Sequence, residues 1–206
     1  MDNNIQKDYP VQPVSFTQVQ IEDEFWRPRL DVNRRVTVPY NLRKCEETGR
    51  IDNFDLAAGA MDGHFTGIRF NDSDVYKVIE GAAYTLHTNP DPALDAYLDA
   101  LIAKIAAAQE KDGYLYTTRT VAERLGADNL APDAGETRWS FLRQSHELYN
   151  VGHLYEAAAA HYLATGKRSL LDVALKNADL ITDVFGPGKR HDVPGHEEIE
   201  IGLVKL

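Results

Sequence analysis

Six segments of this chain carry the apolar spacing of amphipathic helices, and five of them are followed by a turn or loop signal. The clearest is "DPALDAYLDALIAKIAAAQEKDG", in which Asp91 can cap a helix, Pro92 suits its first turn and Gly113 can end it. One stretch alone, "VSFTQVQI", has the composition of a short strand. This pattern predicts an all-α fold built from consecutive helical hairpins.

The lengths of the hairpins and loops limit which helical architectures are possible. No fixed period of about 34 or 40 residues appears, which argues against the common helical repeat arrays. Irregular loops between paired helices favour an α/α toroid, about half of an (α/α)6 barrel, preceded by the short N-terminal strand. We expect an N-terminal arm over 1–13 and the toroid domain over 14–206. A segment of loop is expected over 54–71, and the predicted helices cover 29–48, 74–87, 92–112, 147–165, 169–185 and a last one from "GHEEIEIGLVKL".

The last predicted helix has no glycine, proline or polar cluster to close it, so we expect the chain to be cut within the domain. With 206 residues, 43% of them hydrophobic, the chain can bury a core of ordinary size. Its formal net charge of -10 repels phosphate backbones and anionic lipid heads, so neither nucleic acid nor a membrane is an expected partner.

The N-terminus lacks the basic and then apolar pattern of a signal peptide. We therefore expect a soluble protein that is cytoplasmic as written, although a secreted parent whose leader was removed would read the same. Cys45 is the single cysteine, which excludes an internal disulfide and a multi-thiolate metal site made by this chain alone. We interpret it as a buried, inert thiol.

Two stretches carry candidate chemistry. In "SHELYNVGHLYEA", His146, Asn150 and His153 fall on one stripe of a helix, and the histidines are about 10 Å apart along the axis, too far to share a metal ion. They could be satisfied core histidines, with Ser145 in a capping role, or one wall of a polar pocket. His196, in "RHDVPGHEEIE", also stands at a helix mouth, so His146 and His196 would point at the same end of a central cavity.

Several other polar residues have ordinary structural interpretations. Asp72, Ser73 and Asp74 are expected to cap a helix, and Glu197 and Glu198 to complement a helix dipole. No phosphate loop, nucleophile elbow or zinc-protease motif is present in the sequence.

Five ordered motifs together resemble the N-terminal part of glycoside hydrolase family 127, whose best-known activity is β-L-arabinofuranosidase. They are "IEDEFWRPRLDVNRR", "FNDSDVYKVIEGAAY", "QEKDGYL", "QSHELYNVGHLYEAAAAHYLATGK" and "GHEEIEIGLVKL". The resemblance implies an (α/α)6-barrel catalytic domain and a retaining glycosidase that removes terminal L-arabinofuranose. It also implies a zinc-bound cysteine thiolate as nucleophile and a glutamate as acid/base.

The zinc ligands of the family lie later in its chains, so the resemblance places no catalytic and no metal-binding residue in this sequence. Zinc is expected in the intact enzyme only, and the fragment alone is expected to be inactive. His146 and His196 match family histidines that hydrogen-bond the sugar. His153 matches a family histidine without an assigned role, and we expect it to lie behind the two sugar-binding histidines. Cys45 does not match the nucleophile.

Two alternatives remain open at the level of sequence. One is a non-catalytic, helical carbohydrate-binding or scaffold protein, which the apolar last segment disfavours. The other is a toroid epimerase or lyase with histidines as general bases. The expected partner is a small sugar or oligosaccharide, and neither the glycan linkage nor the oligomeric state follows from the sequence.

Overall fold

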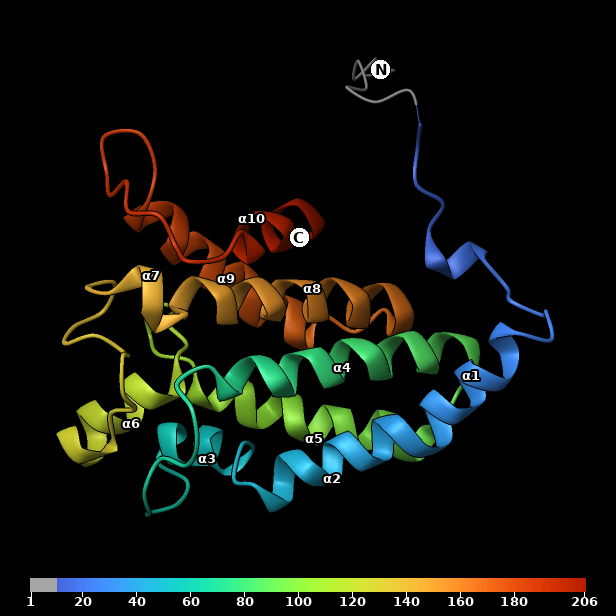
Figure 1. Ribbon diagram of the computed structural model, residues 1–206, viewed down its shortest axis with the longest axis horizontal. Helices are drawn as coiled ribbons and strands as arrows, with labels where there is room; N and C mark the ends of the chain where they lie inside the picture. Colours follow the sequence, from blue (N-terminus) through green and yellow to red (C-terminus); the bar gives the residue numbers. More distant parts are fainter. Residues whose placement is uncertain (1–10) are drawn as a thin grey trace.

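The computed structural model describes residues 11–206, which are mostly helical and form no β-sheet (Figure 1). A 3-10 turn and a π-helical turn, η1 and η2, precede the long helices, and a second 3-10 turn, η3, follows α6. The bounds are η1 Phe16–Gln18, α1 Trp26–Val32, η2 Asn33–Thr37, α2 Val38–Glu47, α3 Asp52–Ala58, α4 Asn71–Thr88, α5 Pro92–Ala108, α6 Thr117–Leu125, η3 Ala127–Asn129, α7 Leu142–Ser145, α8 Glu147–Thr165, α9 Ser169–Val184 and α10 Glu198–Lys205.

The helices are arranged in two layers (Figure 1). Four of them lie side by side in the order α2, α4, α8, α10, although they are not consecutive in the chain. Helices α5 and α9 contact each other and back this row, and α3 packs against α5 and α6. The hairpins α4–α5 and α8–α9 therefore each contribute one helix to each layer, as the predicted helical hairpins require.

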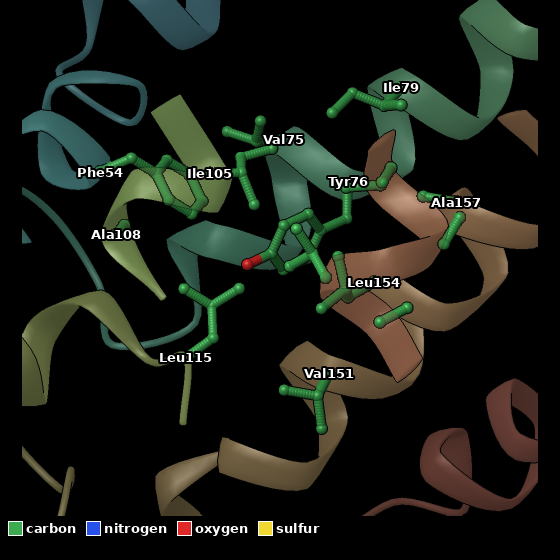
Figure 2. Close-up of a cluster of buried hydrophobic side chains, with 14 of the residues drawn as sticks. Phe54, Val75, Tyr76, Ile79, Ile105, Ala108, Leu115, Val151, Leu154 and Ala157 are labelled. Carbon is green, nitrogen blue, oxygen red and sulfur yellow. The ribbon is translucent and has the colours of Figure 1, made fainter. Parts of the chain in front are cut away.

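The hydrophobic core fills the space between the two layers (Figure 2). Tyr76 and Ile79 of α4 are fully buried there, together with Leu154 of α8 and Ile105 of α5. Phe54 of α3 lies against Tyr76, with ring centroids 5.9 Å apart. Because the apolar faces of α4 and α8 point into this core, their polar stripes face the opposite way.

Several helix ends follow the sequence signals. Asp91 accepts hydrogen bonds from the backbone of Ala93 and Leu94, which confirms its capping role at α5. Gly166 ends α8 in the left-handed conformation (φ 74°), as predicted. Helices α8 and α9 begin where the periodicity places them.

The prediction of an N-terminal strand is wrong. Residues 14–21 contain the turn η1 instead, because the Ser15 hydroxyl accepts from the Thr17 amide and no neighbouring strand is present in residues 11–206 to pair with. The expected arm over 1–13 lies outside the described residues except for its last three positions. Within the described part of the chain, no helix is both long enough and apolar enough to cross a membrane.

Helix α1 begins three residues earlier than expected. Asp23, in the turn before the helix, accepts hydrogen bonds from the backbone amides of Phe25 and Trp26. The continuous helix predicted over 29–48 is interrupted by the π-helical turn η2 and reaches Glu47.

Three short helices, α3, α6 and α7, were not predicted. They are 7, 9 and 4 residues long, and α3 occupies part of the expected loop over 54–71.

Helix α5 ends at Ala108 rather than at Gly113, because Gln109 turns extended (ψ 127°). Gly113 instead permits a close approach to α9, since a Cβ atom there would lie 2.4 Å from the Lys176 carbonyl oxygen. The turn predicted at Asp112 and Gly113 is present, with the Asp112 carboxylate accepting from the Tyr114 amide.

Helix α4 starts at Asn71, so the expected caps are inside its first turn. Its N-cap is Phe70, which makes no side-chain capping bond. The Asp72 carboxylate accepts from the amide and hydroxyl of Thr117 and so ties the start of α4 to the start of α6. Ser73 donates to the Phe70 carbonyl, and Asp74 pairs with Arg50.

Candidate functional site

The two histidines singled out from the sequence come together at one end of the helix row. The Nε2 atoms of His146 and His196 are 3.3 Å apart, and the ring centroids are 5.0 Å apart. His146 precedes α8 and His196 precedes α10, two helices that pack side by side. Both imidazoles keep contact with solvent, so a ligand can reach them. The prediction that the two rings meet at a shared end is confirmed.

His146 is held in an uncommon backbone conformation. Its φ of 63° lies in the left-handed region that residues other than glycine seldom adopt. His146 is the single residue that links α7 to α8. Its Nδ1 lies 2.5 Å from the Gln144 carbonyl oxygen, which also accepts from Arg69. Phe70 stacks on the ring at 4.7 Å. These contacts fix the direction in which the imidazole points.

The hydrogen bond from Nδ1 of His146 also determines which ring nitrogen carries the proton. A carbonyl oxygen only accepts, so Nδ1 carries the hydrogen and Nε2 of the neutral ring is an acceptor. Burial, and then the positive charge of Arg69, lower the pKa of His146, which favours this neutral form. For the two Nε2 atoms to share a hydrogen bond, His196 must be the donor. The pair therefore presents one acceptor and one donor to a ligand that separates them.

Glu147, the residue after His146, forms the base of the site and was not identified from the sequence. It is 1% exposed and accepts hydrogen bonds from the Tyr114 hydroxyl (2.7 Å), the Ser145 hydroxyl (2.8 Å) and the Trp139 amide (3.1 Å). Burial raises the pKa of Glu147, while these donors oppose the rise. The carboxylate thereby joins the loops that carry Tyr114 and Trp139 to the end of α7 beneath His146.

Tyr149 lies one turn along α8 from His146 and contacts both histidines, with ring centroids 5.4 Å from His146 and 5.0 Å from His196. Its hydroxyl accepts from Lys77 of α4 at 2.7 Å. Asn150, predicted on the same stripe, is buried and accepts from the Ser73 amide, so it joins α8 to α4.

His153 lies deeper along the same stripe and belongs to a charged cluster between α8 and α10. Its Nδ1 is 3.0 Å from a carboxylate oxygen of Glu198 and 3.4 Å from one of Glu156. Burial, and then Lys77, lower the pKa of His153 to about 4, so the ring is neutral at pH 7. Lys205 pairs with Glu156 on the other side of the cluster.

Glu198 was interpreted as a helix-dipole residue, but its side chain is turned into this cluster. Burial, and then the neighbouring Glu156, raise the pKa of Glu198 to about 8. Glu198 therefore stays protonated at pH 7 and donates a hydrogen bond to Glu156. Although burial of Glu156 acts to raise its pKa, this hydrogen bond and Lys205 lower it. Glu197 stays exposed at the N-cap position of α10 and makes no side-chain capping bond.

Two glycines bring α10 against α8. A Cβ atom at Gly152 would lie 2.5 Å from the Glu198 carbonyl oxygen, and one at Gly202 would lie 2.5 Å from the Gly152 carbonyl oxygen. Such close backbone approach requires the absence of a side chain. The crossing therefore determines where His196 lies relative to His146.

Two groups of side chains have the composition of a cation site within the described residues. One is His153 with Glu156 and Glu198, and the other is Asp95 with Asp99 and His161. In each, a lysine ammonium already neutralises the carboxylates, since Lys205 pairs with Glu156, and Lys167 lies 2.7 Å from both Asp95 and Asp99.

Cys45 offers no metal ligand. It is buried, and burial raises the pKa of its thiol to about 11, which agrees with the predicted inert thiol.

A model of the family described as β-L-arabinofuranosidase, GH127 catalytic domain, matches residues 18–206. A curated relative, the non-reducing end β-L-arabinofuranosidase of Bifidobacterium longum subsp. longum, is 38% identical over 209 residues. That alignment covers 91% of this chain and 31% of the relative, so the chain spans about a third of the relative's length.

Two solved structures are similar throughout the chain. A GH127 β-arabinofuranosidase is 48% identical with a TM-score of 0.87, over 96% of this chain and 31% of its own. The GH127 β-L-arabinofuranosidase Ara127N from Geobacillus stearothermophilus T6 is 42% identical with a TM-score of 0.83, over 91% of this chain and 29% of its own.

Proposed function

Because this chain belongs to the GH127 β-L-arabinofuranosidase catalytic-domain family, we propose that it is part of a retaining glycosidase that removes terminal L-arabinofuranose. In this proposal the chain supplies a sugar-binding wall, and the catalytic cysteine and glutamate lie elsewhere in the intact protein. The observation that carries the role of the chain is the pairing of His146 and His196 at one accessible end of the helix row.

The chemistry of the pair suits a sugar hydroxyl. A hydroxyl both donates and accepts, and the pair offers an acceptor at His146 Nε2 and a donor at His196 Nε2. A sugar that enters between the rings replaces their mutual bond with two bonds of its own. The neutral form of His146 also avoids the desolvation cost of a buried cation when a sugar displaces water from the site.

The two-layer arrangement supports the proposed toroid. In an (α/α)6 barrel, hairpins alternate between an inner and an outer ring. The row α4, α8, α10, with α5 and α9 behind it, would form an arc of this kind over residues 14–206. The polar stripes of α4 and α8, which face away from the core, would then line the inside of the barrel.

Zinc belongs to the proposal for the intact enzyme, where it would lower the pKa of a thiol nucleophile. Within this chain, Cys45 is buried and largely protonated and does not suit the role. We therefore place the zinc ligands outside the chain. His146 and His196 bind and orient the sugar without contacting the metal.

An aryl β-L-arabinofuranoside assay with the intact protein tests the proposal. We expect release of L-arabinose from the wild type and a large loss of kcat/KM in a His146→Ala, His196→Ala double variant. Absence of release by a zinc-loaded, folded wild type, or formation of an epimerised product, would contradict it.

A further inference from the structure

Tyr149 occupies the centre of the site, between the two sugar-facing histidines and the charged cluster. Its ring contacts His146 edge to face (5.4 Å, 86°) and His196 at a tilt (5.0 Å, 46°). On its deeper side it meets His153 edge to face at 4.6 Å. A single side chain therefore limits the directions available to both imidazoles at once.

The tyrosine is itself held from a neighbouring helix. Lys77 of α4 donates to its hydroxyl at 2.7 Å, and the ammonium lies 4.8 Å from the ring centroid. The same ammonium is 3.2 Å from the Ser73 hydroxyl, so it is anchored on α4. These contacts fix the outer end of the Tyr149 ring.

The inner side of the ring is held by the charged cluster. His153 is in contact with Glu198 and Glu156, and Glu156 is paired with Lys205 of α10. This cluster joins α8 and α10 directly behind Tyr149. The ring can therefore neither swing toward α4 nor slide inward without breaking contacts on two helices.

We propose that Tyr149 is a positioning residue that sets the spacing and orientation of His146 and His196, and that Lys77 holds it in place. The proposal rests on the proposed function, because it assigns Tyr149 a role in binding the same sugar. A misplacement of a binding group by about 1 Å is enough to cost one to two orders of magnitude in rate, so a constraint on both histidines has a measurable effect.

The test compares four single variants and one double variant of the intact protein with wild type. Tyr149→Leu removes the ring, Tyr149→Phe removes only the hydroxyl, and Lys77→Met removes the ammonium group that donates to this hydroxyl. Tyr84→Phe is the matched control, because Tyr84 is also partly exposed on the helix row, donates to Glu80 through its hydroxyl and meets Phe16 edge to face rather than His146 or His196.

Two quantities are measured for each variant. The first is kcat and KM on an aryl β-L-arabinofuranoside. The second is the rate at which diethylpyrocarbonate modifies His146 and His196 in the free protein, followed by peptide mass spectrometry. The second readout reports the histidines directly and does not depend on the identity of the substrate.

We expect Tyr149→Leu to raise KM about tenfold, with a smaller change in kcat, and to change the modification rates of both histidines severalfold. Tyr149→Phe and Lys77→Met should each have a smaller and similar effect, and their double variant should be no worse than either alone. Tyr84→Phe should match wild type in both measurements.

Unchanged modification rates in Tyr149→Leu would overturn the proposal, even if KM rose, because the ring would then contact the sugar without positioning the histidines. Equal effects of Tyr84→Phe and Tyr149→Phe would overturn it as well. If Tyr149→Leu does not fold, the Lys77→Met and Tyr149→Phe pair still decides the question. A wild type without arabinofuranosidase activity would refute the proposed function, while the modification rates would still test the positioning role.

Discussion

The imidazoles of His146 and His196 face each other with their Nε2 atoms 3.3 Å apart, although fifty positions separate them in the chain. Their meeting depends on the backbone conformation of His146 and on the close packing of α8 against α10.

His196→Ala should raise KM about tenfold and also lower kcat on an aryl arabinofuranoside, because one of the two groups proposed to hold the sugar is lost. The zinc content of the intact protein, measured by plasma mass spectrometry, should not change. His191→Ala is the control, since His191 is an exposed histidine in the preceding loop. Loss of zinc in His196→Ala would contradict a role limited to the sugar.

Gly152→Ala should destabilise the protein by roughly 1–3 kcal/mol, because the added methyl group would overlap the Glu198 carbonyl oxygen. It should also weaken sugar binding, since α10 and His196 must move together. Gly81→Ala on α4 is a matched control: no atom lies within 4 Å of a Cβ there, so the variant should be neutral or more stable. Chemical denaturation and KM distinguish the two, and equal stabilities would refute the close crossing.

Glu147→Gln should cost about 1–3 kcal/mol of folding stability, because an amide offers one acceptor oxygen where the carboxylate now serves three donors. Activity should fall with it, since the loop that carries His146 loses its support. Glu123→Gln, at an exposed position of α6, should have no effect on either quantity. A Glu147→Gln protein as stable as wild type would show that the buried carboxylate is dispensable.

His153 should make the protein less stable in acid. Its pKa in the folded state is about 4, below the usual value of 6.5, so the unfolded chain binds a proton first as the pH falls. The contribution is present above about pH 6.5 and is lost progressively as the pH drops through about 4. Unfolding midpoints measured across this range should decline less steeply for His153→Gln than for wild type. Parallel curves for the two proteins would rule out this titration.

Cys45 should be unreactive and dispensable. Its thiol is buried and its pKa is raised to about 11, so little thiolate forms at neutral pH. Alkylation of the native protein with iodoacetamide, mapped by mass spectrometry, should leave Cys45 unmodified, and denaturation should expose it. Cys45→Ala should retain kcat. A Cys45→Ala protein that folds but is inactive would require a different assignment of the nucleophile.

The sequence by itself determined most of the long helices and their ends. Apolar spacing and end signals are local, so the extent of α8 and the caps at Asp91 and Gly166 could be read directly from neighbouring residues. The same local reasoning missed α3, α6 and α7, which are too short to establish a period, and assigned a strand to 14–21 where none forms.

Only the tertiary structure decided what the polar residues do. Asp72 was expected to cap a helix but accepts a hydrogen bond from Thr117 on another helix. Glu198 was expected to complement a helix dipole but contacts His153. The partner of Tyr149, Lys77, lies 72 positions away on α4. Such contacts depend on how helices cross, and the crossing of α8 and α10 rests on two glycines whose missing side chains carry no periodic signal. The physical reason is that periodicity specifies which face of a helix is buried, whereas packing specifies which residues that face meets.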